Sequence, residues 1–202
     1  MPRTHILKIS RLEALTDGIF AIAMTILVLN LSLPDHIAVS SLSAFLMNDI
    51  VLKLFVYIGS FIILGTLWIG MHFQFGLLDH VNRPYLWAHV LYLMITCIVP
   101  FSANLIAIYP NNILTLSFYA TNLLAASLSQ ILISQVAHFY KLNNHYYNTA
   151  IRRAVIGRIL LAPVFYLGAI LVAFWNTSWA FVFLIAPILI YIIPGKVDHF
   201  DR

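Results

Sequence analysis

The chain carries the stretch RLEALTDGIFAIAMTILVL at residues 11–29, in which charged side chains lead directly into an apolar run. Asp17 falls inside the membrane helix that this run predicts. A charge at the centre of a bilayer costs about 2.5–3.5 kcal/mol on insertion scales, so a carboxylate retained in such a helix is expected to face protein or water. The stretch therefore predicts a membrane protein whose first helix is a candidate functional site.

The composition of the whole chain agrees with this prediction. Of its 202 residues, 62% are hydrophobic and only 9% are charged, whereas a soluble domain carries about 25% charged residues. Uncharged stretches cover residues 18–34, 54–78, 84–140 and 159–195, and turn residues at 109–112 and 175–178 divide the two longest. Because a membrane-spanning helix needs about 20 apolar residues, we predict an all-α integral membrane protein with six transmembrane helices, at residues 12–33, 52–78, 84–108, 113–138, 153–174 and 177–194.

The basic residues predict how these helices are oriented. An even number of spans places both termini on the same side of the membrane, and of the 11 Lys and Arg residues only Lys53 then falls on the opposite side. Such residues accumulate on the cytoplasmic side, so both termini are predicted to be cytoplasmic, in a multi-pass protein of the cell (inner) membrane. The net charge of +4 is then explained by topology and by contact with the anionic headgroups of the lipid bilayer, and no nucleic-acid partner is expected.

Residues 1–202 are predicted to form a single transmembrane domain, because the sequence contains no internal repeat and no loop long enough for a soluble domain. The longest connection, residues 139–151, is aromatic and polar and is expected at the level of the cytoplasmic headgroups. The sequence lacks a Walker loop, the Gly-x-Ser-x-Gly and His-Glu-x-x-His signatures, and a pair of cysteines. We therefore expect no catalytic residues, no cofactor and no resident metal, and we predict that the protein is not an enzyme. No soluble partner is implied.

Two faces of the first helix differ in character. At 100° per residue, Ile22, Ile26 and Leu29 share one stripe with Thr25 beside them, whereas Asp17 lies on another face. Such a helix can dock its polar group into the bundle and present its apolar stripe elsewhere. Because a stripe of Ile and Leu is most often packing or lipid contact, the pattern alone does not decide its role.

Motifs in three helices add a family resemblance. The first helix carries Arg11-x-x-x-Leu15-Thr16-Asp17, the second carries Trp68-x-x-x-His72, and the third carries Pro100-Phe101. The first motif resembles the Arg-x-x-x-Phe-Ser-Asp signature of the lysosomal and endosomal potassium channel family. The combination is similar to the prokaryotic branch of that family, whose subunits have one set of six helices.

This resemblance implies a homotetramer in which the first helix of each subunit lines a central pore, with K⁺ as the permeant ion and without the filter loop of other potassium channels. Carried over position by position, Ile22 corresponds to the constricting isoleucine of the pore. Ile26 and Leu29 continue the lining, and Thr25 matches a pore threonine that the family links to potassium preference.

The resemblance also implies a polar network that holds the pore helix against its neighbours. Its expected members are Arg11, Thr16, Asp17, Trp68 and His72. The motif departs from the family pattern where Leu15 replaces Phe and Thr16 replaces Ser, and Thr16 keeps the hydroxyl. A further departure is His89, at a position in the third helix where an asparagine is expected.

These observations favour a passive, potassium-favouring cation channel that is gated at a hydrophobic constriction. One alternative is a proton-coupled secondary transporter that uses Asp17 and His72. Another is a non-transporting membrane scaffold built on the polar face of residues 113–138, which carries hydroxyl and amide side chains among small residues. A carrier predicts saturating, stoichiometric exchange, a channel predicts a conductance that reverses at the potassium equilibrium potential, and a scaffold predicts co-purification with a partner.

Overall fold

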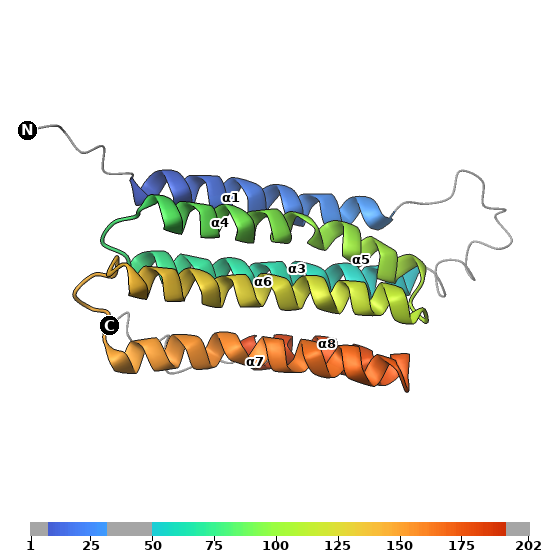
Figure 1. Ribbon diagram of the computed structural model, residues 1–202. Coiled ribbons are helices and arrows are strands. Elements are labelled where there is room, and N and C mark those ends of the chain that lie inside the picture. The colour runs from blue at the N-terminus through green and yellow to red at the C-terminus, as the bar shows by residue number, and fades with distance from the viewer. Residues whose placement is uncertain (1–7, 32–49, 193–202) are drawn as a thin grey trace, which may run out of the picture.

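A computed structural model of the protein describes residues 8–31 and 50–192, which are helical apart from short connections and one isolated bridge between Leu78 and Asn143 (Figure 1). The helices are α1 (Ile9–Ile26) with its 3-10 extension η1 (Leu27–Leu31), α3 (Val51–Gly76), α4 (Arg83–Cys97), α5 (Val99–Ile108), α6 (Ile113–Phe139), α7 (Thr149–Ala173) and α8 (Thr177–Ile192).

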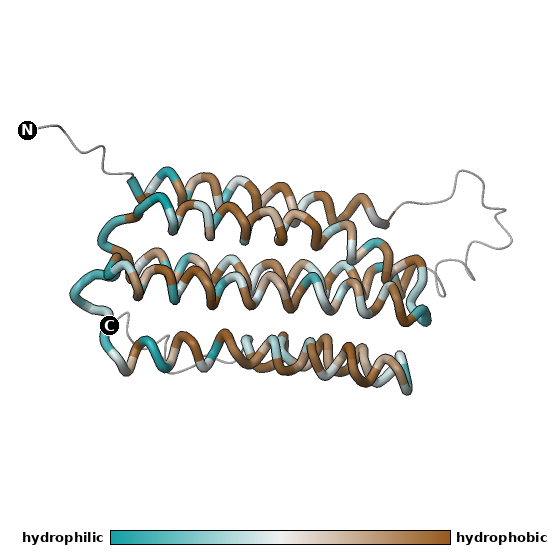
Figure 2. Tube along the Cα trace, viewed as in Figure 1, coloured by the Kyte–Doolittle hydropathy of each residue, from teal (hydrophilic) through white to brown (hydrophobic). Residues whose placement is uncertain are grey.

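The predicted fold class is confirmed, because each predicted span has a helical counterpart. Within the described residues, five helices are long and apolar enough to cross a membrane: Ile9–Leu29, Val51–Gly76, Arg83–Ile108, Ile113–Phe139 and Thr149–Ala173. The sixth, Thr177–Tyr191, is apolar but shorter, and the predicted ends of the first and sixth spans at residues 33 and 194 lie outside the described residues. Figure 2 shows apolar residues along all the helices and polar residues gathered in the connections at the two ends. The chain is a multi-pass membrane protein.

The helices form three layers that run side by side (Figure 1). One outer layer contains α1 with α4 and α5, the middle layer contains α3 and α6, and the other outer layer contains α7 and α8. The connections 77–82 and 140–148 meet at one end of the bundle, where the Asp79 amide donates to the Leu142 carbonyl at 2.9 Å. α1 therefore lies at the edge of the subunit, with one face packed and the other available.

Asparagine side chains begin four of the helices. Asn82, Asn112 and Asn148 accept hydrogen bonds from the amides of Tyr85, Leu114 and Ile151 at 3.0, 2.8 and 2.9 Å, and Asn176 accepts from Ser178 at 2.9 Å. Such caps satisfy amides that have no partner within the helix. They explain why α6 and α8 begin where the turn residues predict.

The third predicted span is broken into α4 and α5 next to Pro100, which lacks the amide hydrogen that a continuous helix needs. Asn122 of α6 bridges this break, because its Nδ2 donates to the Ile95 carbonyl and its Oδ1 accepts from the Ser102 hydroxyl, both at 3.0 Å. A neighbouring side chain thus replaces bonds that the broken helix cannot make. The polar face of residues 113–138 serves here in helix contact.

Gln130 of the same helix makes the second such contact. Its Nε2 donates to the Leu67 carbonyl of α3 at 2.7 Å and to the Tyr92 hydroxyl of α4 at 3.1 Å. The Gln130 amide also lies so close to Gly70 that a Cβ there would meet Nε2 at 3.3 Å. α6 is consequently tied to both α3 and α4 through side chains that are buried.

Candidate functional site

The apolar stripe of α1 lies on the outside of the subunit. Ile22, Ile26 and Leu29 are 59%, 43% and 70% exposed, whereas the opposite face of the helix packs inward through residues such as Phe20 and Leu27. In a membrane protein, an exposed stripe of this kind contacts either lipid or another protein chain. The stripe is therefore not required for packing within one chain.

Thr25 lies on this exposed side of α1. Its hydroxyl donates its hydrogen to the Ile22 carbonyl at 2.8 Å, within the same helix. Because the hydrogen is used in this bond, the lone pairs of the hydroxyl oxygen can accept from water or coordinate a cation.

A groove runs alongside the stripe, between α1 and the break in the neighbouring span. Its volume is about 440 Å³, and it is lined from α1 by Ile19, Ile22, Ala23 and Ile26 and from the α4–α5 region by Cys97, Pro100, Phe101 and Asn104. The sequence motif Pro100-Phe101 thus lies beside the predicted pore residues, although sequence reasoning did not identify Cys97 or Asn104 as neighbours of the stripe. No periodicity signals this groove, because it depends on how two separate helices pack.

Three members of the predicted polar network come together between α1 and α3. The Trp68 indole Nε1 of α3 donates to the Asp17 carboxylate of α1 at 2.8 Å. The Trp68 ring also stacks on His72 one turn along α3, with the ring centres 5.7 Å apart and an interplanar angle of 26°. The bond from Trp68 to Asp17 is charge-assisted, which makes it stronger than a neutral hydrogen bond.

Thr16 makes its contact with a different partner. Its buried hydroxyl donates to the Leu12 carbonyl at 2.7 Å and also lies 2.7 Å from His89 Nε2 on α4. A hydroxyl has one hydrogen, so His89 Nε2 must carry the hydrogen of the second bond and donate it to Thr16. Because Thr16 and Asp17 point 100° apart, their two contacts, with α4 and α3, fix the rotation of α1 about its own axis.

Arg11 is not drawn into these contacts. Its side chain is exposed, and no side-chain bond joins it to Thr16, Asp17, Trp68 or His72 in the part of the chain that the structure describes. His89, by contrast, makes a polar contact with Thr16 that the sequence did not predict. The sequence does place a hydroxyl and an imidazole in two otherwise apolar helices. Because polar groups buried in a membrane need hydrogen-bond partners, such a pair is a candidate for a contact between the helices.

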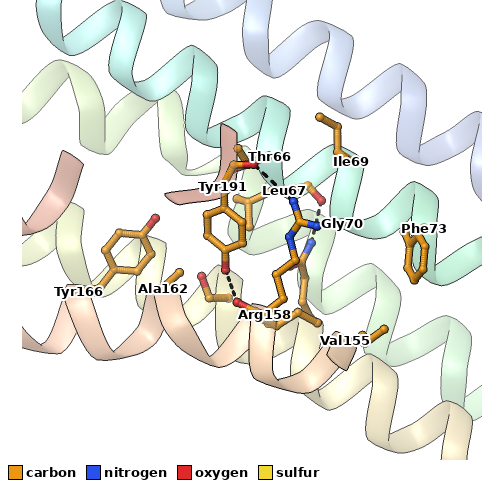
Figure 3. Close-up of a pocket in the computed structure, with 13 residues that line it drawn as sticks. Thr66, Leu67, Ile69, Gly70, Phe73, Val155, Arg158, Ala162, Tyr166 and Tyr191 are labelled. Atoms are coloured by element: carbon orange, nitrogen blue, oxygen red, sulfur yellow. Dashed lines mark hydrogen bonds between the residues drawn. The ribbon is translucent and has the colours of Figure 1, made fainter. Parts of the chain in front are cut away.

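A second cavity, of about 90 Å³, lies between α3, α6, α7 and α8 (Figure 3). At its edge, Arg158 Nη2 donates to the Tyr191 carbonyl at 3.4 Å and the Tyr191 hydroxyl donates to the Arg158 carbonyl at 2.6 Å. The guanidinium also lies 5.9 Å from the centre of the Tyr191 ring. These contacts join α8 to α7, and no residue of α1 lines the cavity.

Two comparisons with known proteins bear on the family of this chain. A model of the family described as the endosomal/lysosomal potassium channel TMEM175 matches residues 11–100. A protein described as a potassium channel from Chryseobacterium sp. (strain P1-3) is 27% identical over 188 residues, which cover 92% of this chain and 93% of the relative. A second, from Chamaesiphon minutus (strain ATCC 27169 / PCC 6605), is 31% identical over 125 residues, which cover 58% of this chain and 60% of the relative.

A solved structure gives independent support for the fold. The crystal structure of a lysosomal potassium-selective channel TMEM175 homolog from Chamaesiphon minutus superposes with a TM-score of 0.78 at 24% sequence identity, over 91% of this chain and 96% of that chain. The relatives are named as channels, so the prediction that the chain is not an enzyme is confirmed. The family model that matches residues 11–100 and the bacterial relatives make this chain similar to the TMEM175 potassium channel family, and the solved structure shows that it shares the helical fold of a TMEM175 homolog.

Proposed function

We propose that the protein is a passive, potassium-favouring cation channel, formed by four identical subunits whose α1 helices surround a central pore. The observation that carries this proposal is the exposure of Ile22, Ile26 and Leu29 on a helix whose other face is packed. The matched bacterial relatives are named potassium channels, and a pore formed between several copies of α1 would bring the stripe into contact with protein rather than with lipid alone.

The proposed gate is an apolar collar of Ile22, continued by Ile26 and Leu29. Where four such side chains approach one another, water is expelled, and a cation would lose its hydration shell without gaining ligands. A small rotation or outward tilt of α1 widens the collar and readmits water. The pore therefore opens and closes by wetting, and it needs no filter loop.

Thr25 is the proposed source of potassium preference. Its hydroxyl hydrogen is bonded to the Ile22 carbonyl, so the lone pairs of its oxygen can coordinate a passing cation. The oxygen then replaces one of the water molecules that the cation loses from its hydration shell. Partial replacement disfavours Na⁺, which holds its hydration shell more strongly than K⁺ does. Four hydroxyls replace only part of a shell, and the proposed selectivity is accordingly modest.

The contacts of Asp17 and Thr16 are proposed to hold the pore helix rather than to touch the ion. Asp17 bonds to Trp68 of α3, Trp68 stacks on His72, and Thr16 bonds to His89 of α4. Asp17 is exposed on the surface of the subunit, and a charge at the depth of a membrane usually pairs with another element and orients it. Together these contacts keep the apolar stripe turned away from its own subunit.

The orientation follows from the positions of the basic residues. Arg83, Lys141 and Arg152 lie near the end of the bundle where the connections 77–82 and 140–148 meet, and Lys8 precedes α1 at the same end. We place this end in the cytoplasm and the protein in the cell (inner) membrane, with its lipid bilayer as the surrounding medium.

A proton-coupled transporter that uses Asp17 and His72 is the other candidate. The indole of Trp68 bonds to Asp17 and stacks on His72, so the two titratable groups share one neighbour. A proton relay through them would need water or movement of Trp68, because an indole N–H only donates. The arrangement therefore favours a holding role for these residues.

Recording in planar bilayers under opposing K⁺ and Na⁺ gradients tests the proposed function. We expect a conductance that reverses close to the potassium equilibrium potential and does not shift when the pH differs across the membrane. Saturating exchange with a fixed proton stoichiometry would instead support the transporter. The absence of any conductance from folded tetramers would contradict the channel.

A further inference from the structure

A small polar cavity lies where the connections 77–82 and 140–148 meet, at the end of the bundle away from η1. Its volume is about 10 Å³, and its polar lining comes from Gln74, Tyr85, Ser134, Asn143 and Tyr147. These residues belong to α3, α4, α6 and the 140–148 connection. The cavity thus joins parts of the chain that are far apart in sequence, and it shares no residue with the stripe of α1.

Four polar atoms of the lining are buried without a hydrogen-bond partner among the described residues: Gln74 Nε2, Gln74 Oε1, the Tyr85 hydroxyl and the Tyr147 hydroxyl. Gln74 is only 6% exposed and Tyr85 is fully buried. Buried polar groups in folded proteins are nearly always bonded to protein or to ordered water. Four such atoms around one cavity indicate a common partner inside it.

The surrounding structure holds these side chains in place. Tyr85 is in the first turn of α4, and its ring stacks on His89 with an interplanar angle of 14°. Tyr147 contacts the His138 ring, with centres 5.9 Å apart, and its amide donates to the Asn144 carbonyl at 3.1 Å. Burial raises the pKa of Tyr147, against a smaller lowering by Arg152, so its hydroxyl keeps its hydrogen at neutral pH.

We propose that this cavity binds one ordered water molecule, which bridges Gln74 of α3, Tyr85 of α4 and Tyr147 of the 140–148 connection. Its volume is close to that of a single water probe, and a buried water needs two to four polar partners. The Gln74 amide offers both a donor and an acceptor, and each tyrosine hydroxyl can do either. A bound K⁺ fits poorly here, because the Gln74 Nε2 group would present hydrogens to the cation.

The water would complete a set of contacts that fasten the 140–148 connection to the α3–α4 connection. Asn144 Nδ2 donates to the Gly76 carbonyl at 2.8 Å, and the Asn144 amide donates to the Leu77 carbonyl at 2.9 Å. The connection was expected to lie among the headgroups, whereas the structure docks part of it onto the helix ends. With the bridging water in place, the 140–148 connection forms a folded cap that stabilises this end of the bundle. This role does not depend on whether the protein conducts ions.

Thermal unfolding of the protein in detergent micelles tests the proposal, because a bound water and an empty cavity predict changes in Tm of opposite sign. We compare Tyr85→Phe, Tyr147→Phe and the double variant, each of which removes only oxygen atoms and keeps the rings. A bridging water predicts that each single change lowers Tm by about 2–4 °C, and that the double change lowers it by less than the sum, because the first change already releases the water. Tyr146→Phe, at an exposed neighbour, is the matched control and should leave Tm unchanged.

An empty cavity predicts the opposite sign. Removing an oxygen that has no partner would then raise Tm or leave it unchanged, and either result for Tyr85→Phe or Tyr147→Phe would overturn the proposal, as would losses that simply add. Cryo-electron microscopy of the wild-type protein gives the second readout. Density for a water within hydrogen-bond distance of Gln74 and at least one of the two hydroxyls supports the proposal, and a map that resolves other waters but none in this cavity overturns it.

Discussion

Ile22→Asn is expected to raise potassium flux into liposomes about tenfold, and to lower the preference for K⁺ over Na⁺. A tenfold change corresponds to about 1.4 kcal/mol at the barrier, which is modest for replacing four apolar side chains by four amides at the narrowest point. The amides would keep the collar wet and offer oxygen ligands to either cation. Flux of both ions should be measured on the same vesicles, at equal amounts of tetramer.

A matched control separates this effect from a general disturbance of the fold. Leu171 is as exposed as Ile22 but lies on α7, in the outer layer away from α1. Leu171→Asn should therefore leave both the flux and the ion preference at the wild-type level. If Ile22→Asn also left them unchanged in folded tetramers, Ile22 would not line the pore.

Asp17→Ala is expected to reduce the fraction of tetramer in detergent by about half or more, while the remaining tetramers keep their ion preference. The change removes the acceptor of the Trp68 bond, and hydrogen bonds to charged groups contribute about 1.5–3 kcal/mol. Without that bond, only the Thr16 contact with His89 fixes the rotation of α1, so α1 turns more easily and its stripe meets its copies less often. Size-exclusion chromatography coupled to light scattering measures the loss.

Two further variants test the cause of that loss. Asp17→Asn keeps an oxygen that can accept from Trp68, and it should retain more tetramer than Asp17→Ala does. Glu13→Ala removes a carboxylate one turn earlier in α1 and should have little effect. Stable Asp17→Ala tetramers with an altered ion preference would show that Asp17 contacts the ion, which contradicts the holding role.

The helices could be predicted from the sequence because charge-free runs and turn residues both mark them. α6 begins at Ile113, as the turn at residues 109–112 predicts, since Asn112 caps it. α7 begins at Thr149 rather than 153, because Asn148 caps the helix and the charged Arg152 and Arg153 lie within its first turns. Long basic side chains near a helix end can extend toward the headgroups, so excluding charged residues from the predicted span made it too short.

The site was predictable only where a motif carried it. The contact between Asp17 and Trp68 was expected from the family resemblance, and no periodicity would have paired residues on two different helices. The partner of Thr16 was missed, since His89 lies 73 positions away along the chain. The groove beside the stripe and the polar cavity at Gln74 were also missed, because both depend on the packing of helices rather than on the order of residues.

The most direct test of the pore is to place a cysteine at position 22 and attempt to block the current. In a Cys97→Ala background, Ile22→Cys channels should lose most of their potassium current when a thiol-reactive methanethiosulfonate reagent is added, because four modified side chains would fill the collar. Val164→Cys on the exposed side of α7 should be modified without loss of current. Persistent current through Ile22→Cys tetramers that are fully labelled would show that the stripe of α1 faces lipid and that another segment forms the pore.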